Sequence, residues 1–130
     1  MTSPPAIASV TRHLDQALVD AYARAARDPN PLHTDVEYAK TTPFGRPIAH
    51  GMLVLALVAE AMANTFGERW ASGGTLNVRW RAPAIPPVTV TVRAALRSDS
   101  DSVATYEFTC EDDTGALLLT GTASARYADA

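Results

Sequence analysis

The feature that most limits the fold of this chain is a change of hydrophobic period at Gly73 and Gly74. Before this point lies the most apolar stretch of the chain, residues 48–66, whose centre is rich in alanine. After it, apolar and polar residues alternate, as in strands that bury one face. One long apolar helix beside such a sheet predicts an α+β domain in which the helix lies in the concave face of a curled antiparallel sheet. Four alternating runs are expected to form an antiparallel meander, and they cover residues 75–81, 88–94, 106–110 and 116–127.

The first third of the chain predicts a strand, a helix and a stiff turn. Residues 6–10 form a short apolar run, and apolar residues then recur at helical spacing over residues 14–26. Pro29 and Pro31 each lack an amide donor and each disfavours a helical conformation in the preceding residue. Residues 28–33 are therefore expected to form a rigid, non-helical turn.

Two signals place helix starts between this turn and the apolar stretch. Thr34 and Glu37 have the spacing of a capping box, which predicts a short helix over residues 35–40. Pro47 suits the first turn of a helix, so the long helix is expected to begin there.

Length and charge narrow the classes of function. With 130 residues, the chain is expected to be one domain, residues 1–130. Its net charge is −3 and Lys40 is its only lysine, so no basic stripe is present to bind a nucleic acid. Nucleic acid is therefore not expected as a partner.

The apolar stretch and the single cysteine indicate a setting inside the cell. His50, Gly51, Glu60 and Asn64 interrupt the apolar stretch, which predicts a buried helix and no membrane partner. Cys110 has no second cysteine to pair with, and the first ten residues lack the basic and long apolar regions of a secretion signal. We expect a reducing, cytoplasmic environment.

The stiff turn carries the first group of chemically useful side chains. Asp28 and His33 lie on either side of it, and Asn30 lies between the two prolines. A rigid loop holds an acid and a base in place before a substrate arrives. These residues are therefore candidates for acid and base catalysis. In the alternative interpretation, Asp28 and Asn30 cap local turns and His33 packs.

The second candidate lies at the expected start of the long helix. A glycine such as Gly51 lets another atom approach the backbone, and the amides at a helix N-terminus carry partial positive charge. This combination predicts a site for a developing oxyanion. The alternative is that Gly51 permits tight packing and that His50 is satisfied by backbone groups. The sequence has no glycine-rich phosphate loop, no Gly-x-Ser-x-Gly motif and no metal-ligand spacing, so no cofactor or metal is expected.

Together the two segments resemble the MaoC-like dehydratases, the family of (R)-specific enoyl-CoA hydratases with the hot-dog fold. The matching residues are Arg27-Asp28-Pro29-Asn30-Pro31-Leu32-His33-Thr34-Asp35 and Phe44-Gly45-Arg46-Pro47-Ile48-Ala49-His50-Gly51-Met52-Leu53. Weaker similarity is seen in Asn77-Val78-Arg79-Trp80-Arg81-Ala82-Pro83 and Thr120-Gly121-Thr122-Ala123.

The resemblance implies a hydro-lyase that adds water to enoyl thioesters or removes it from 3-hydroxyacyl thioesters. Asp28 and His33 would hold one water and act as catalytic acid and base. Asn30 would orient them, and the Gly51 amide would bind the thioester carbonyl. The substrate would be an acyl-CoA or a carrier-bound acyl thioester, with no cofactor and no metal.

The sequence departs from the family pattern at two places. Ala56 and Ala59 occupy the helix face where many relatives carry a serine, so no serine hydroxyl assists at the carbonyl. The link Ile85-Pro86-Pro87-Val88 replaces the usual proline, glycine and aspartate. The small side chains Ala56, Ala59 and Ala63 predict either room for an acyl chain beside the helix or close packing of the helix on the sheet.

Two other functions compete with hydration. A hot-dog thioesterase would use an acidic residue on the central helix, where Glu60 lies; the alternative for Glu60 is a solvated or capping charge. A non-catalytic acyl-binding partner subunit is the second competitor. For each of these functions the unpaired sheet edges predict a homodimer or larger assembly, with the substrate channel along the subunit interface.

Overall fold

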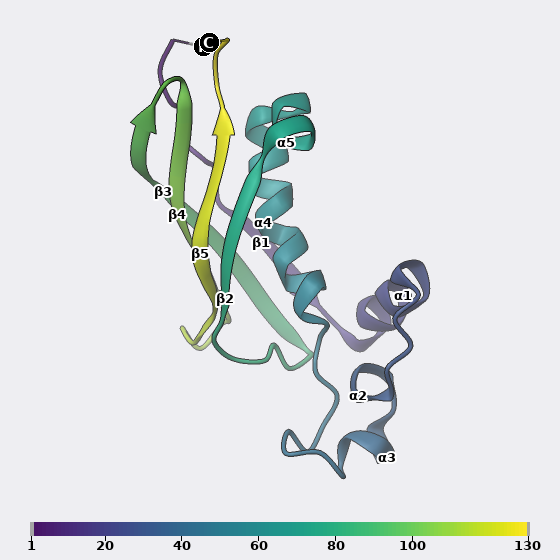
Figure 1. Ribbon diagram of the computed structural model, residues 1–130. Helices are drawn as coiled ribbons and strands as arrows, with labels where there is room; N and C mark the ends of the chain where they lie inside the picture. Colours follow the sequence, from purple (N-terminus) through teal and green to yellow (C-terminus); the bar gives the residue numbers. More distant parts are fainter. Residues whose placement is uncertain (1, 130) are drawn as a thin grey trace.

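A five-stranded antiparallel sheet curls around one long helix in the computed structural model, which describes residues 2–129 (Figure 1). The strand order is β1-β3-β4-β5-β2, so β1 and β2 form the two edges. The fold is therefore α+β, with the helix on the concave side of the sheet, as the change of period predicted. The strands are β1 (Val10–Leu14), β2 (Thr75–Trp80), β3 (Val88–Ser100), β4 (Val103–Glu111) and β5 (Leu117–Arg126).

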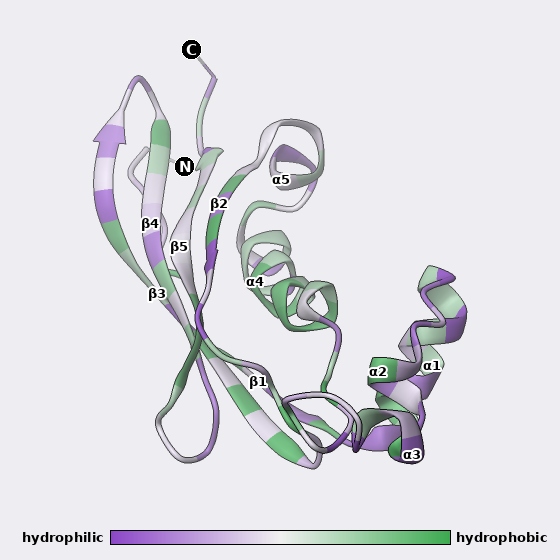
Figure 2. Cartoon of the chain, turned by 60° about the horizontal axis from the view of Figure 1, so that its bottom comes forward, coloured by the Kyte–Doolittle hydropathy of each residue, from purple (hydrophilic) through white to green (hydrophobic). Residues whose placement is uncertain are grey.

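The helices fall into two groups. Helices α4 (Gly51–Phe66) and α5 (Glu68–Gly73) lie beside the sheet. Helices α1 (Gln16–Ala26), α2 (Pro31–Thr34) and α3 (Val36–Ala39) project away from it as a separate arm (Figures 1 and 2). This arm carries the first candidate segment of the sequence, and the start of α4 carries the second.

The core lies between α4 and the concave face of the sheet, and apolar side chains of both are buried there. The ribbon of α4 is mostly green, the colour of hydrophobic residues, in Figure 2. Tyr106, Phe108 and Cys110 all face inward from β4, as their alternation predicted. Burial raises the pKa of the Cys110 thiol to about 12. This cysteine is a core residue and not a reactive thiol.

Backbone hydrogen bonds explain why the long helix starts later than Pro47. The Ile48 amide donates to the Leu32 carbonyl at 3.3 Å, and the Ala49 amide donates to the Ala84 carbonyl at 2.8 Å. These bonds hold the chain in a non-helical path up to His50, so α4 begins at Gly51. The bond to Leu32 ties the start of α4 to the arm.

The N-terminal elements also begin and end at other residues than expected. The strand predicted at residues 6–10 is β1, which begins at Val10, and Leu14 is its fully buried last residue. Helix α1 starts only at Gln16 because the Asp15 carboxylate caps it.

The predicted non-helical turn and the capping box differ from the structure as well. Residues 31–34 form one helical turn, since Pro31 is tolerated in the first position of a helix and Asn30 caps it. Asp35, and not Thr34, is the N-cap of α3, because its carboxylate accepts from the Tyr38 amide at 3.1 Å.

The last four strands form a meander only in part. Strands β3, β4 and β5 are consecutive neighbours, but β2 pairs with β5 at the far edge, and β1 pairs with β3. Helix α5 was not predicted either. Because β2 is an edge strand, its inward-facing Leu76 and Trp80 stay exposed.

None of the helices within residues 2–129 combines the length and the apolar character needed to cross a membrane.

Candidate active site

The end of α1 sets the position of Asp28. Arg27 adopts a left-handed conformation, with φ 53° and ψ 42°, and the next amide, that of Asp28, donates to the Ala23 carbonyl at 3.0 Å. This left-handed residue closes the helix, and Pro29 prevents its continuation. The Asp28 side chain is left 51% exposed beside the start of α4.

Asn30 shapes the turn between the two catalytic candidates. Its side-chain oxygen accepts from the Leu32 amide at 3.0 Å and so caps α2. This capping contact is what the structural alternative predicted for Asn30. The contact fixes the backbone of the turn between Asp28 and His33.

His33 is anchored by a main-chain carbonyl. Its Nδ1 lies 2.8 Å from the Ile48 carbonyl oxygen, which only accepts, so Nδ1 carries a proton and Nε2 remains free to exchange one. The Gln16 side-chain amide donates to the His33 carbonyl at 2.7 Å and holds α2 against α1. His33 can therefore gain or lose a proton at Nε2 without losing its anchor.

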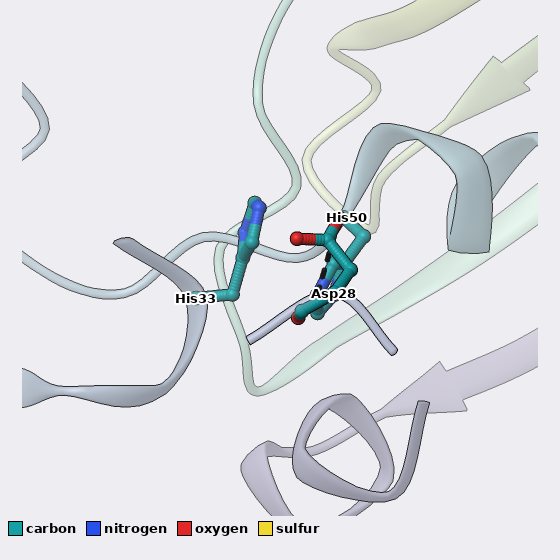
Figure 3. A group of neighbouring side chains, drawn as sticks. All are labelled: Asp28, His33 and His50. Carbon is teal, nitrogen blue, oxygen red and sulfur yellow. Dashed lines mark hydrogen bonds and ion pairs between the residues drawn. The ribbon is translucent and has the colours of Figure 1, made fainter. Parts of the chain in front are cut away.

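Asp28, His33 and His50 meet where the arm touches the start of α4 (Figure 3). One oxygen or nitrogen atom from each side chain lies within 4.8 Å of the others. A single water can bridge polar atoms at this separation, because each hydrogen bond spans about 2.7–3.2 Å. The fold thus brings the predicted acid and base to one point.

Aspartate and histidine also bind metal ions, so these three residues could in principle form a metal site. Their spacing in the sequence did not predict such a site. However, the His33 and His50 rings are stacked, with centroids 3.8 Å apart and planes 27° apart. A ring nitrogen binds a metal along a direction in its ring plane, and the planes of stacked rings run side by side. The arrangement therefore suits a water molecule better than a tetrahedral metal site.

Gly51 begins α4 with an amide that pairs with no acceptor among residues 2–129. The amides of Leu53 and Val54 both donate to the His50 carbonyl, and the His50 side chain provides no cap. A free amide at the N-terminus of a 16-residue helix is suited to bind a developing negative charge.

Gly51 also lines a cavity of about 310 Å³. Ile48, Trp80 and Leu119 are among its other lining residues. A Cβ atom at position 51 would lie 2.6 Å from Cζ3 of Trp80. The absence of a side chain at Gly51 thus lets the Trp80 ring approach the backbone closely, as the packing interpretation predicted. The unpaired amide is the feature that the oxyanion interpretation requires. Asp28 and His33 do not line the cavity. Ile48 links their position to it, because Ile48 lines the cavity and its carbonyl oxygen holds His33.

The helix face that carries Ala56 and Ala59 turns away from the sheet. Ala56 and Ala63 are exposed, and Met52 on the same face is 58% exposed. This excludes the expectation of close packing on the chain's own sheet and leaves open space beside the helix.

Glu60 lies in the middle of α4, so it is not a capping charge. Its side chain is 32% exposed, and its Oε1 pairs with Nη2 of Arg12 at 2.6 Å. Asp28 has no such cationic partner at short range, since its nearest is His50 Nε2 at 4.0 Å. Of the two acids, Asp28 is the better placed to act as a base.

Sequence reasoning noted His50 but assigned it no role. It is 2% exposed, and among residues 2–129 no acidic, lysine, arginine or amide side chain is buried. A signal was present: histidine is not a preferred N-cap residue, yet His50 directly precedes the helix-start glycine. An apolar residue would be more stable at this buried position if the side chain made no polar contact.

Comparisons of the sequence and of the structure with known proteins point to one family. Residues 3–114 match the family described as MaoC like domain. An (R)-specific enoyl-CoA hydratase of Aeromonas caviae is 32% identical over 123 residues, which cover 89% of this chain and 88% of that protein. A 3-hydroxyacyl-thioester dehydratase Z of Mycobacterium tuberculosis is 37% identical over 84 residues, or 62% of this chain and 55% of that protein. The solved structure of an (R)-hydratase from A. caviae involved in PHA biosynthesis superposes with a TM-score of 0.82 at 27% identity, covering 97% of this chain and 98% of that one.

Proposed function

The chain belongs to the MaoC-like family of hot-dog proteins, and from this premise we propose that it is a hydro-lyase of enoyl and 3-hydroxyacyl thioesters. The observation that carries the proposal is the meeting of the Asp28 carboxylate with the His33 ring, beside the free Gly51 amide. The named relatives, an enoyl-CoA hydratase and a hydroxyacyl-thioester dehydratase, support the same reaction.

The reaction requires three groups. A base removes a proton from the water that attacks the β-carbon, an acid delivers a proton to the α-carbon, and a donor stabilises the enolate-like oxygen between these events. In our proposal Asp28 is the base, His33 is the proton donor through Nε2, and the Gly51 amide is the oxyanion donor. Asn30 keeps the turn in shape.

The substrate is proposed to be an acyl-CoA or a carrier-bound acyl thioester, and the chain's own residues supply all the acid, base and donor groups. Arg81 borders the cavity at Gly51 and also a groove on the outer face of the sheet that holds Arg79 and Arg97. These arginines are suited to the phosphates of such a substrate.

We also propose that two copies pair through β2, with the substrate channel along their interface. Supporting this, β2 is an edge strand, and Leu76, Trp80 and Met52 leave an exposed apolar surface between β2 and α4. The single cysteine, buried and unpaired, supports a cytoplasmic setting.

The test is the product formed from crotonyl-CoA. A hydratase yields hydroxybutyryl-CoA, a thioesterase releases free thiol, and an acyl-binding subunit yields neither. Asp28→Asn keeps the shape of the side chain but removes the base, and His33→Gln removes the proton donor. Each should lose about 100-fold to 10,000-fold in rate.

A matched control is Glu60→Gln, which neutralises the acid on the central helix in the same way. It should leave the hydration rate nearly unchanged, because Glu60 is paired with Arg12. Since Asp28 and His33 act on one water, the double variant should be little slower than either single one. A thioesterase that uses the central helix would give the reverse order, with Glu60→Gln inactive and Asp28→Asn active in thiol release.

A further inference from the structure

His50 occupies a position that is costly for a polar side chain. It is 2% exposed, immediately before α4, and it does not cap the helix. A buried imidazole has to find partners for its two nitrogens or lose stability. Its contacts therefore indicate what the ring does.

These contacts reach both proposed catalytic residues. Nε2 of His50 lies 3.2 Å from the Asp28 carbonyl oxygen and 4.0 Å from Oδ2 of Asp28. The ring is stacked on that of His33, with centroids 3.8 Å apart, and the edge of Tyr22 packs against it at 4.8 Å. One side chain thus contacts the backbone of Asp28 and the ring of His33 (Figure 3).

The hydrogen bonds also define the proton position on the ring. The Asp28 carbonyl oxygen only accepts, so Nε2 of His50 is the nitrogen that carries the proton. Nδ1 is buried and has no partner among residues 2–129. A proton on Nδ1 would be a buried donor without an acceptor, whereas a proton on Nε2 can be donated to the Asp28 carbonyl.

We propose that His50 is a positioning residue for the Asp28 and His33 pair. Its Nε2–H fixes the backbone of Asp28, and its flat face fixes the plane of the His33 ring, so that Nε2 of His33 and the Asp28 carboxylate address the same water. His50 does not touch the substrate. This inference rests on the proposed function of Asp28 and His33.

Three substitutions separate the two contacts. His50→Phe keeps a flat ring for stacking but loses the donor, His50→Gln keeps a donor but loses the ring, and His50→Ala loses both. Because a misplacement of about 1 Å costs about 100-fold in rate, His50→Ala should lower kcat for crotonyl-CoA about 100-fold. KM should stay within about threefold, since the substrate is not contacted. His50→Phe and His50→Gln should each restore part of kcat.

A matched control accounts for lost stability. Met62 is also buried on α4 but lies twelve residues further along, about 18 Å by the rise of a helix. Met62→Ala should lower the melting temperature without lowering kcat of the folded enzyme. Where His50→Ala does not fold, His50→Phe and His50→Gln provide the comparison.

Two further measurements test the mechanism of positioning. In an Asp28→Asn background, His50→Ala should cost little more, because a positioning residue matters only through the group it positions. In the wild-type protein at pH 7, imidazole ¹⁵N chemical shifts of His50 should report a protonated Nε2 and a bare Nδ1.

The proposal is overturned if His50→Ala keeps the wild-type kcat, if its effect adds fully to that of Asp28→Asn, or if Nδ1 carries the proton. It is also overturned if Met62→Ala lowers kcat as much as His50→Ala does. These outcomes are distinct from failure of the proposed function, in which Asp28→Asn and His33→Gln themselves retain wild-type rates.

Discussion

Replacing Gly51 by alanine tests the oxyanion site directly. The new Cβ would lie 2.6 Å from Cζ3 of Trp80, whereas carbon atoms in contact prefer about 3.5–4.0 Å. The Trp80 ring would have to move by about 1 Å. Because this ring is 56% exposed at the end of an edge strand, it can swing outward. The methyl group then remains in the cavity that Gly51 lines, where it competes for space with an atom bound at the amide of residue 51.

The expected effect on rate is larger than the effect on stability. Overpacking costs about 1–3 kcal/mol in a closed core, and we expect the lower end here because Trp80 can move. Loss of one oxyanion donor costs about 100-fold to 1,000-fold in rate, which corresponds to about 2.7–4 kcal/mol of transition-state stabilisation. Gly51→Ala should therefore fold, with a kcat for crotonyl-CoA at least about 100-fold below that of the wild type.

The same substitution in a Trp80→Leu background separates the two causes. With the ring removed, the steric conflict at position 51 disappears, but the methyl group still competes for space with an atom bound at the amide. Steady-state hydration of crotonyl-CoA and urea unfolding of all four proteins complete the cycle. The oxyanion assignment is refuted if Gly51→Ala hydrates at nearly the wild-type rate, or if its loss vanishes in the Trp80→Leu background.

Three other predictions concern stability and assembly. Burial raises the pKa of Cys110 from 9.0 to about 12. The buried, protonated thiol therefore stabilises the fold fully below pH 9, and this stabilisation is lost as the pH rises from 9 to 12. The loss in the free energy of unfolding reaches about 4 kcal/mol. Unfolding of Cys110→Ala should show a shallower alkaline decline and hydration should persist; an unchanged slope, or loss of hydration in the folded variant, would contradict this. Asn30→Ala removes a helix cap and should cost about 1 kcal/mol in urea unfolding, and no change in the midpoint would argue against the cap. The wild type should be at least a dimer by light scattering at micromolar concentration. Leu76→Lys on β2 should weaken the dimer, whereas Leu96→Lys, a change to another exposed leucine on β3, should not. A monomeric wild type, or equal effects of the two lysines, would exclude pairing through β2.

The sheet and its central helix could be predicted because their signal is local. Alternation along residues 106–110 places Tyr106, Phe108 and Cys110 on one face whatever the strand pairs with. Strand order is not local: nothing in residues 75–81 distinguishes pairing with β3 from pairing with β5. The position of β2 at the edge follows from contacts between segments far apart in the sequence.

The site was predictable to the extent that it lies within one turn. Asp28 and His33 are five residues apart around two prolines, and the fold brings them together. His50 is seventeen residues further on, and only the fold stacks it on His33. Its role could not be inferred from residue type, because a histidine before a helix is equally compatible with backbone contacts alone.

Ile48 serves two purposes with different parts of the same residue. Its carbonyl oxygen holds His33, and its side chain lines the cavity that Gly51 also lines. The carbonyl is present whichever amino acid stands at position 48. A substitution at position 48 can therefore enlarge or narrow the cavity while the carbonyl that anchors the histidine stays in place.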